Sequence, residues 1–497
     1  ILFVASECVP FIKTGGLADV VGALPKSLDR TEFDVRVILP DYTCIPEKYR
    51  SQFHYITNFY MDLGSLGNIY VGILSFELDG VTYYFIDNEH YFSGDKPYGD
   101  MRFDIEKFCF FSKAALSILP VIGFHPDIIH CHDWQAGLVP VYLHTLFKPN
   151  PFYHGIRTII TIHNLRFQGI WDIKTIQSIT GLPLDIFTPD RLEFQKDANM
   201  LKGGMVYADR ITTVSGTYAG EIQMPYYGEG LDGLLRARHD SLSGILNGID
   251  YDIYNPQTDP KIEKNYSVKD FRKGKAANKT KLQEELGLPV NPDVMMISMI
   301  TRLTDQKGLD LVAWVMERML DTEIQFVVLG TGDANYENMF RHYEWTRKDK
   351  VSASIYFNDE RAHKIYASSD AVLMPSSFEP CGLTQLIALR YGSVPIVRET
   401  GGLRDTVEPY NRFAGTGTGF SFTNYNADEM LNIIFYAEQV YYDNRKEWDK
   451  MVERGMKADF SWKNSAKEYE ALYRSLIGKG ENSGVIPRFW PRHKNSC

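Results

Sequence analysis

Short apolar runs that end in polar or glycine-rich turns recur along the whole chain, and many of these turns lead into a helical segment. Apolar runs of this length are typical of buried strands in parallel sheets, whose two faces are covered by helices. Both halves of the sequence show this alternation, which predicts an α/β protein with two Rossmann-like, doubly wound domains facing a cleft. The runs that set the pattern are Ile1–Ser6, Asp34–Pro40, Asp127–His130, Arg157–Ile162, Asp209–Val214, Val294–Ile300, Ile324–Leu329, Asp370–Met374 and Val394–Val397.

Length also favours two domains, because 497 residues exceed what one hydrophobic core usually holds. Residues 255–264 are rich in Pro, Asp and Thr and are typical of a linker. We therefore expect a first domain over residues 1–254 and a second over residues 255–460, with a helix at 461–477 and a tail at 478–497. Asp79-Gly80, between two alternating runs, predicts a β-hairpin.

Composition excludes several functions. A net charge of −10 and a pI of about 5.7 give no basic surface for nucleic acid or an anionic membrane. No apolar run approaches the roughly 20 residues that span a bilayer. The six cysteines lack paired spacing, so we expect neither a zinc cage nor a disulfide framework, and a reducing compartment such as the cytoplasm. The chain starts at Ile1 without Met, so a plastid location remains open if a transit peptide was removed.

Glu379 lies in the most informative turn, within Met374–Ala388 (MPSSFEPCGLTQLIA). A strand is followed by a small-residue turn, and a helix is expected to begin near Gly382, Leu383 and Thr384. Unpaired N–H groups and the dipole at such a helix start attract anions. A phosphate bound there would place its leaving bond near Glu379. The alternative is an ordinary loop whose acid caps the helix.

Three cations follow predicted strands. Arg302 and Lys307 come after a buried apolar run. The planar, forked guanidinium of an arginine together with the compact ammonium charge of a lysine suits a diphosphate. Lys13 adjoins Gly15 and Gly16, which allow a backbone to approach a ligand closely. The glycine spacing matches neither the P-loop nor the dinucleotide-binding pattern. The alternative for each cation is a solvated surface position.

Polar side chains also end two strands of the first half. Asp133 follows His132 after one run, and His163 and Asn164 follow another, which predicts a shared crevice at the carboxyl ends of the strands. A metal at His-x-His-Asp would need further ligands at fixed spacing, and none is found, so no metal is expected.

Three more positions are candidates for ligand contact. Asn247 lies in an Asn-Gly turn. Tyr98 lies in an aromatic, glycine-rich loop, which suits either a sugar or a packed surface. Phe357 follows a predicted strand and suits either a base or the core.

Taken together, these residues resemble the family of bacterial glycogen synthases and plant starch synthases over about residues 1–477. No one motif is specific, but their order along the chain is. The motifs are Lys13-Thr14-Gly15-Gly16-Leu17 with Asp19, His132-Asp133-Trp134, Thr161-Ile162-His163-Asn164, Leu246-Asn247-Gly248-Ile249-Asp250, Arg302 with Lys307, and Glu379-Pro380-Cys381-Gly382-Leu383-Thr384.

The resemblance implies a GT-B fold whose acceptor domain and nucleotide domain close over ADP-glucose, without a metal or another cofactor. The last helix would cross back to the first domain. The implied catalytic residues are Glu379, Asp133, His163 and Lys13. The implied donor-binding residues are Lys13, Gly15, Gly16, Asn247, Arg302, Lys307, Phe357, Gly382, Leu383 and Thr384, and the implied acceptor-binding residues are Tyr98 and Asn164.

The implied reaction is retaining transfer of glucose to the non-reducing end of an α-1,4-glucan, either glycogen or starch. Many proteins with this fold have a second Glu on the helix after the first, whereas Leu386 stands in that region here. Three alternatives stay open: a glycan phosphorylase, a UDP-glucose-dependent transferase, and a glucan-binding protein without catalysis. A phosphorylase would need a lysine for pyridoxal phosphate, and no matching sequence context is found. The presence of Arg302, Lys307 and Glu379 argues against the glucan-binding protein.

Overall fold

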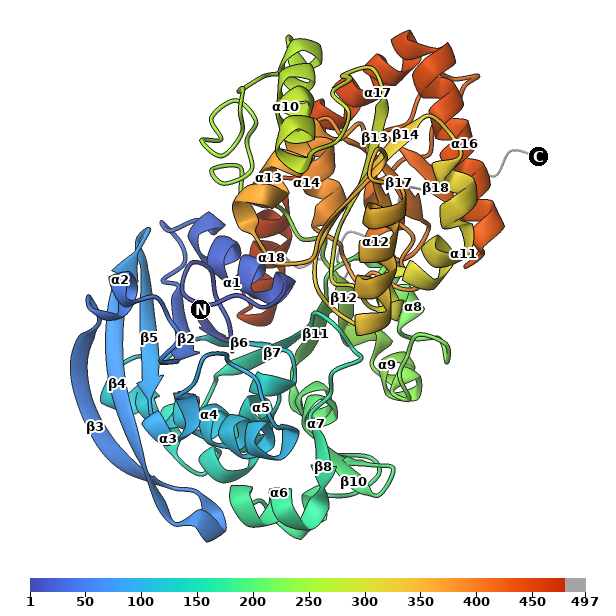
Figure 1. Cartoon of the computed structure of the whole chain (residues 1–497). Coiled ribbons are helices and arrows are strands. Elements are labelled where there is room, and N and C mark those ends of the chain that lie inside the picture. Colours follow the sequence, from blue (N-terminus) through green and yellow to red (C-terminus); the bar gives the residue numbers. More distant parts are fainter. Residues whose placement is uncertain (479–497) are drawn as a thin grey trace.

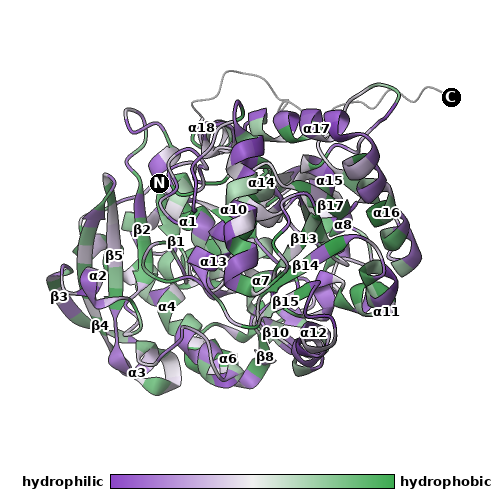
Figure 2. Ribbon diagram, turned by 45° about the horizontal axis from the view of Figure 1, so that its top comes forward, coloured by the Kyte–Doolittle hydropathy of each residue, from purple (hydrophilic) through white to green (hydrophobic). Residues whose placement is uncertain are grey.

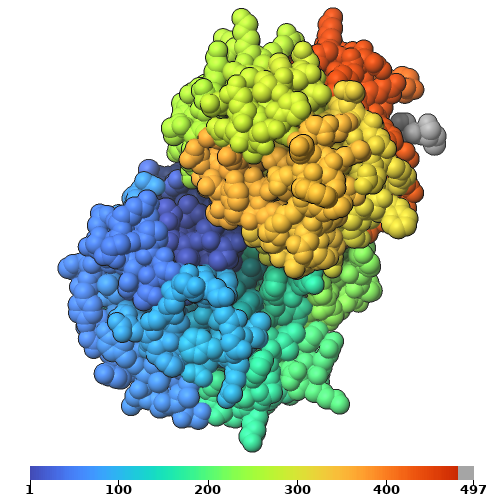
Figure 3. All heavy atoms as spheres, in the orientation of Figure 1, coloured from blue at the N-terminus to red at the C-terminus, as the bar shows by residue number. Residues whose placement is uncertain are grey.

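The computed structural model describes residues 1–478, which form two lobes that each surround their own sheet (Figure 1). The space-filling view shows a recess where the two lobes meet (Figure 3). Each lobe has its own large hydrophobic core. The two-domain α/β architecture predicted from the alternating pattern is confirmed.

The first lobe contains a nine-stranded sheet in the order β12-β11-β7-β6-β1-β2-β5-β4-β3. It is parallel from β12 to β5, and the last two strands add antiparallel pairs at one edge. A small sheet β8-β10-β9 (Ile170–Asp172, Asp197–Asn199, Glu193–Phe194) lies beside it. The strands of the large sheet are β1 Leu2–Val4, β2 Arg36–Pro40, β3 His54–Asp62, β4 Asn68–Leu78, β5 Val81–Asp87, β6 Ile128–His132, β7 Arg157–Ile162, β11 Arg210–Thr213 and β12 Leu242–Gly244.

The second lobe contains a six-stranded parallel sheet in the order β15-β14-β13-β16-β17-β18. Its central strands are buried, and Figure 2 shows hydrophobic colouring along β13 and β14. The strands are β13 Met295–Ile300, β14 Ile324–Leu329, β15 Val351–Ser354, β16 Ala371–Met374, β17 Val394–Arg398 and β18 Phe420–Phe422.

Helices cover both sheets. In the first lobe they are α1 Gly16–Ser27, α2 Glu47–Arg50, α3 Glu89–Phe92, α4 Met101–Val121, α5 Leu138–Tyr142, α6 Ile173–Thr180, α7 Met200–Tyr207, α8 Gly216–Glu221 and α9 Asp232–Ala237. The rest are α10 Phe271–Leu286, α11 Leu309–Leu320, α12 Ala334–Thr346, α13 Asp359–Ser368, α14 Thr384–Arg390, α15 Gly401–Thr406, α16 Ala427–Asp443, α17 Arg445–Lys457 and α18 Trp462–Leu476. Within residues 1–478, none of the helices is long and apolar enough to cross a membrane.

Two local predictions can be compared with the structure. The Asp79-Gly80 hairpin is confirmed: both residues have positive φ, and β4 pairs antiparallel with β5. The interpretation of Phe357 as a core residue is wrong, because β15 ends at Ser354 and the Phe357 side chain lies on a loop, 82% exposed.

The chain passes between the lobes twice, and the two passages lie side by side. Ile249 N donates to Phe460 O at 2.8 Å, and Ile249 bridges Ser461. A side chain at Gly248 would place its Cβ 2.7 Å from Trp462 N, so only glycine allows this approach. After the second passage, α18 packs against α1 and contributes Trp462 and Tyr473 to the first core.

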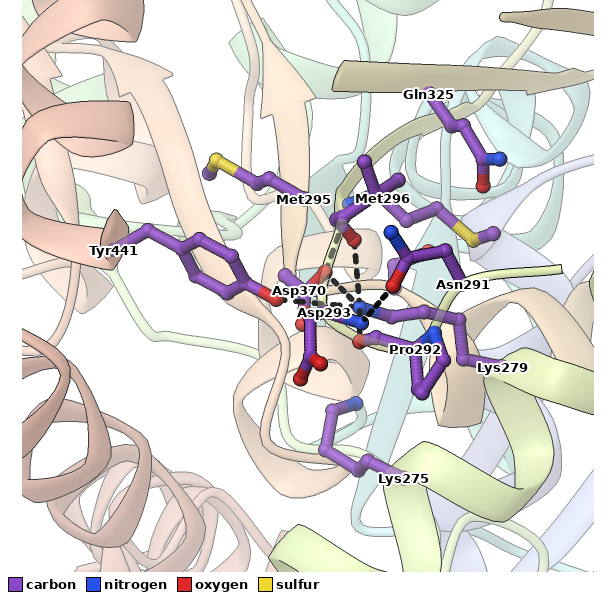
Figure 4. A network of polar contacts seen from close by, with 12 residues as sticks. Lys275, Lys279, Asn291, Pro292, Asp293, Met295, Met296, Gln325, Asp370 and Tyr441 are labelled. Carbon is purple, nitrogen blue, oxygen red and sulfur yellow. Dashed lines mark hydrogen bonds and ion pairs between the residues drawn. The ribbon is translucent and has the colours of Figure 1, made fainter. Parts of the chain in front are cut away.

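Buried lysines of α10 connect this helix to the second sheet (Figure 4). Lys279 Nζ pairs with Asp370, whose Oδ2 also accepts from Met296 N at 2.7 Å. Lys275 Nζ donates to Tyr366 O, Ala367 O, Tyr391 O and Ser393 Oγ at 3.0–3.2 Å, near the ends of α13 and α14. A cation is favourable at helix C-termini. Burial nevertheless lowers the pKa of Lys275 to about 7. These amines fix the strands and helices that hold the candidate site.

Candidate active site

Glu379 lies in the turn between β16 and α14, and it contacts a cation from a neighbouring strand end. Lys307 Nζ lies 2.7 Å from Glu379 Oε2, which also accepts from Ser376 Oγ at 2.9 Å. Glu379 is buried. Gly308 makes this approach possible, because its φ is +72° and an added Cβ would lie 2.2 Å from Pro375 O. The structure therefore brings the predicted cation and the predicted acid into one ion pair.

The backbone of Glu379 is held by the first residues of α15. Gly402 N donates to Glu379 O at 3.1 Å, and a Cβ at Gly401 would lie 1.9 Å from the same oxygen. Thr384 begins α14, and Gly382 precedes it with a φ of +73°. The glycines at the start of α15 therefore pack closely against the turn that contains Glu379 and Cys381.

Arg302 and Phe357 lie on loops at the same edge of the second sheet, after β13 and after β15. Both are exposed. Neither side chain forms a hydrogen bond or ion pair with another predicted site residue, as far as residues 1–478 extend. The sheet order places β13, which precedes Arg302, next to β16 and the Glu379 turn, whereas β14 and β13 separate β15, which precedes Phe357, from β16.

On the first lobe, Glu7 organises the loop that contains Lys13. The Glu7 carboxylate accepts from Thr14 N, from Thr14 Oγ1 at 2.7 Å and from Tyr98 OH at 2.5 Å. Lys13 itself pairs with Asp19 at 2.8 Å. The predicted acceptor residue Tyr98 is therefore joined to the predicted donor loop through an acid that sequence reasoning missed. Glu7 directly follows the first apolar run, and this position at the end of a predicted strand is the only sequence feature that points to a role in the site.

Asp133 follows β6 in a strained backbone conformation, with φ 55° and ψ −171°. Its Oδ1 accepts a hydrogen bond from His163 N at 2.7 Å. This contact joins the carboxyl ends of β6 and β7, where the sequence predicts that Asp133 and His163 share a crevice. Burial raises the pKa of the Asp133 carboxyl to about 7, against the lowering effect of the backbone N–H groups of His163 and Asn164. The carboxyl therefore titrates close to neutral pH.

His163 is neutral near pH 7, because burial lowers its pKa to about 3. Its Nε2 lies 2.9 Å from His132 Nδ1. Asn164 Oδ1 accepts from Arg166 N at 3.1 Å. In the described part of the chain, no group of three or more His, Cys, Asp or Glu side chains is placed to hold a metal ion.

The lobes meet directly beside these groups. Ser215 Oγ donates to Pro380 O at 2.5 Å, and a Cβ at Gly16 would lie 3.7 Å from Leu383 Cδ1. Glu221 Oε1 accepts from Thr400 Oγ1 at 2.9 Å and from Gly401 N at 3.1 Å. These contacts bring the first-lobe residues to the Glu379 turn. Sequence reasoning missed Glu221, because its partners lie about 180 residues further along the chain.

Asn247 adds a polar group at this junction. It is buried, and its Oδ1 has no hydrogen-bond partner among residues 1–478. Its backbone contacts the Cys381 thiol, in the turn after Glu379. A buried carbonyl oxygen without a partner is costly, so this one is available to a ligand hydroxyl.

Asp133→Asn is expected to stabilise the protein at pH 8. The folded pKa of about 7 lies above the ordinary 3.8, so the folded state favours the neutral acid, and stability falls as pH rises from about 4 to about 7. Asn does not ionise and therefore avoids this loss. We expect the free energy of unfolding of the variant to exceed that of the unmodified protein by about 2 kcal/mol above pH 7. Thermal unfolding at pH 8 and at pH 4 checks it: the gain should vanish at pH 4. The control is exposed Asp95→Asn, and equal gains at both pH values would contradict the assignment.

The chain is similar to known proteins over nearly its whole length. The starch synthase catalytic domain family matches residues 1–237, and the glycosyl transferases group 1 family matches residues 278–455. A glycogen synthase of Lachnospira eligens is 63% identical over 476 residues, covering 96% of this chain and 99% of the relative. One of Lachnoclostridium phytofermentans is 60% identical with the same coverage.

A solved structure extends the comparison. The catalytic domain of starch synthase IV from Arabidopsis thaliana, bound to ADP and acarbose, aligns with a TM-score of 0.87 at 35% identity. The alignment covers 96% of this chain and 99% of that one. The chain therefore belongs to the glycogen synthase and starch synthase family of glucosyltransferases, and the fold is GT-B.

Proposed function

We propose that this enzyme transfers glucose from ADP-glucose to the 4-hydroxyl at the non-reducing end of an α-1,4-glucan, with retention of configuration and release of ADP. The bacterial relatives named glycogen synthase support glycogen as the polymer. The ADP and acarbose in the Arabidopsis structure support an adenine nucleotide donor and an oligosaccharide acceptor.

The observation that carries the proposal is the contact between Lys307 Nζ and Glu379 Oε2 at 2.7 Å. A diphosphate near Lys307 competes with Glu379 for the ammonium group. When the donor binds, its diphosphate replaces Glu379 as the ion-pair partner of Lys307, and the Glu379 carboxylate becomes free. The freed carboxylate then faces the sugar, where positive charge develops in the transition state.

The chemistry needs charge stabilisation on both sides of one carbon. The bond from the anomeric carbon to the phosphate oxygen breaks, and a bond to the acceptor 4-oxygen forms on the same face. Lys307 and Arg302 stabilise the negative charge on the departing ADP, with Lys13 reaching it when the lobes close. The hydroxyl proton passes to the leaving phosphate oxygen. Neutral His163 adds no positive charge next to the cationic sugar.

Incubation with radiolabelled ADP-glucose and UDP-glucose, each with and without a glucan primer, tests the proposal. We expect label in the polymer from ADP-glucose only when primer is present. Efficient transfer from UDP-glucose alone would select the other donor. Absence of transfer from both donors would contradict the proposed function.

A further inference from the structure

His132 ends β6 directly before Asp133, and the reaction described above gives it no task. Its side chain is fully buried, and its ring packs against the rings of Phe3 and His130 at interplanar angles of 13° and 28°. Nδ1 of His132 lies 2.9 Å from Nε2 of His163, which follows β7. Because the packed rings fix the plane of the His132 imidazole, its Nδ1 edge stays directed at His163.

Both imidazoles are neutral near pH 7, so each ring carries one N–H group. Burial lowers the pKa of His132 well below its ordinary value, and burial lowers the pKa of His163 to about 3. A hydrogen bond between the two nitrogens can therefore take only two forms. In the first form His132 donates from Nδ1, and the proton of His163 lies on its Nδ1. In the second form His163 donates from Nε2, and the proton of His132 lies on its Nε2.

The surroundings of His132 Nε2 select between these two forms. This atom is buried and has no hydrogen-bond partner among residues 1–478. In the second form it would be a buried N–H group without an acceptor, and folded proteins contain fewer unpaired donors of this kind than unpaired acceptors. In the first form it is only an unprotonated acceptor. The first form is therefore favoured, and His163 carries its proton on Nδ1.

This first form leaves His163 with a donor group that the protein does not use. Nδ1 of His163 has no hydrogen-bond partner within the described part of the chain, and the side chain is only partly buried. The backbone of His163 is fixed separately, since its N–H donates to Asp133 Oδ1 at 2.7 Å. The imidazole N–H group is therefore free to donate to a hydroxyl group of a bound sugar.

We infer that His132 is a positioning residue: by donating from Nδ1 to His163 Nε2, it holds the proton of His163 on Nδ1, where it donates to a hydroxyl group of the transferred glucose. This inference rests on the proposed function. In the opposite tautomer, Nδ1 of His163 could only accept a hydrogen bond, so the tautomer sets the orientation of that hydroxyl group. His132 acts only through His163, because its own side chain is fully buried.

The tautomer of His163 can be measured directly by ¹⁵N NMR of the unmodified enzyme, labelled at its 12 histidines. A His163→Gln variant lacks the signals of His163 and so assigns them. We expect a protonated Nδ1 and an unprotonated Nε2, whereas a proton on Nε2 overturns the inference. This measurement decides the question even where a variant fails to fold. It also needs no glucose transfer, so its failure is distinct from that of the proposed function, which fails if neither nucleotide sugar is a donor.

Two substitutions of His132 separate hydrogen bonding from packing. His132→Phe keeps a packed ring but removes the donor, so we expect kcat to fall roughly thirtyfold. This is less than the roughly hundredfold or larger loss on removal of an oriented donor, because a fraction of His163 keeps the productive tautomer. His132→Asn places an amide donor where Nδ1 lies and should restore much of kcat. The Kd for ADP should not change in either variant, because other residues contact the phosphates.

A role in packing alone predicts the opposite order, with His132→Phe more active than His132→Asn. That order, or an unchanged kcat in His132→Phe, overturns the inference. The matched control is His125→Phe, because His125 is exposed and lies just before the other end of β6. We expect the control to keep the kcat of the unmodified enzyme.

Discussion

Lys307→Ala is expected to lower kcat/KM for ADP-glucose by about a thousandfold. The ammonium lies on the carboxylate of Glu379 at a buried strand end, where its charge is weakly screened. Its loss removes the stabilisation of the departing diphosphate. It also leaves the buried Glu379 charge without its ion-pair partner, which is costly. Initial rates at varied ADP-glucose with fixed primer measure the effect.

Arg318→Ala is the matched control for this variant. Arg318 lies on α11 near Lys307 in sequence, but its side chain is half exposed and pairs with Asp428 at 2.8 Å. We expect no change in kcat/KM for the control. A Lys307→Ala enzyme that unfolds at the same temperature as the unmodified one and keeps its kcat/KM within twofold would exclude Lys307 from the phosphate site.

Glu379→Gln is expected to lower kcat by about a thousandfold while ADP binds more tightly. The amide keeps the size of the side chain but removes the negative charge beside the anomeric carbon. It also releases Lys307 from the ion pair, so the ammonium meets the diphosphate without competition. Single-turnover rates give the first effect, and calorimetric titration with ADP gives the second.

A double-variant cycle separates the exchange from simple repulsion between Glu379 and phosphate. In a Lys307→Ala background there is no lysine to release, so Glu379→Gln should not tighten ADP binding further. If Glu379→Gln tightens ADP binding by the same factor in that background, the exchange of ion-pair partners at Lys307 is contradicted, and repulsion between Glu379 and the phosphates explains the tighter binding. Glu317→Gln on α11 serves as the control, because its side chain is 68% exposed.

Most of the scaffold could be predicted, because its signals are local. The apolar runs Arg157–Ile162 and Ile324–Leu329 predict two buried strands, and the structure has strands with these same bounds. The Lys307–Glu379 pair could be anticipated only as two strand-end residues in one sheet. Their contact depends on the sheet order, which places β13 beside β16.

The parts that escaped prediction depend on contacts between distant segments. Glu7 reaches Tyr98, 91 residues away, and Glu221 reaches Gly401, 180 residues away. No periodic pattern links such pairs. The strained backbone of Asp133 is likewise invisible in the sequence, because an aspartate does not by itself require a φ of 55° with a ψ of −171°.

The late return of α18 has a consequence for how the protein is made. A ribosome releases the first lobe long before the second, and early domains commonly fold while synthesis continues. Here the first core needs Trp462, Tyr469 and Tyr473, which leave the ribosome after every strand of both sheets. One flank of the nascent first lobe therefore stays uncovered until α18 has been synthesised. Truncated products that end before residue 461 are therefore expected to bind chaperones or aggregate, even though every strand of both sheets is present.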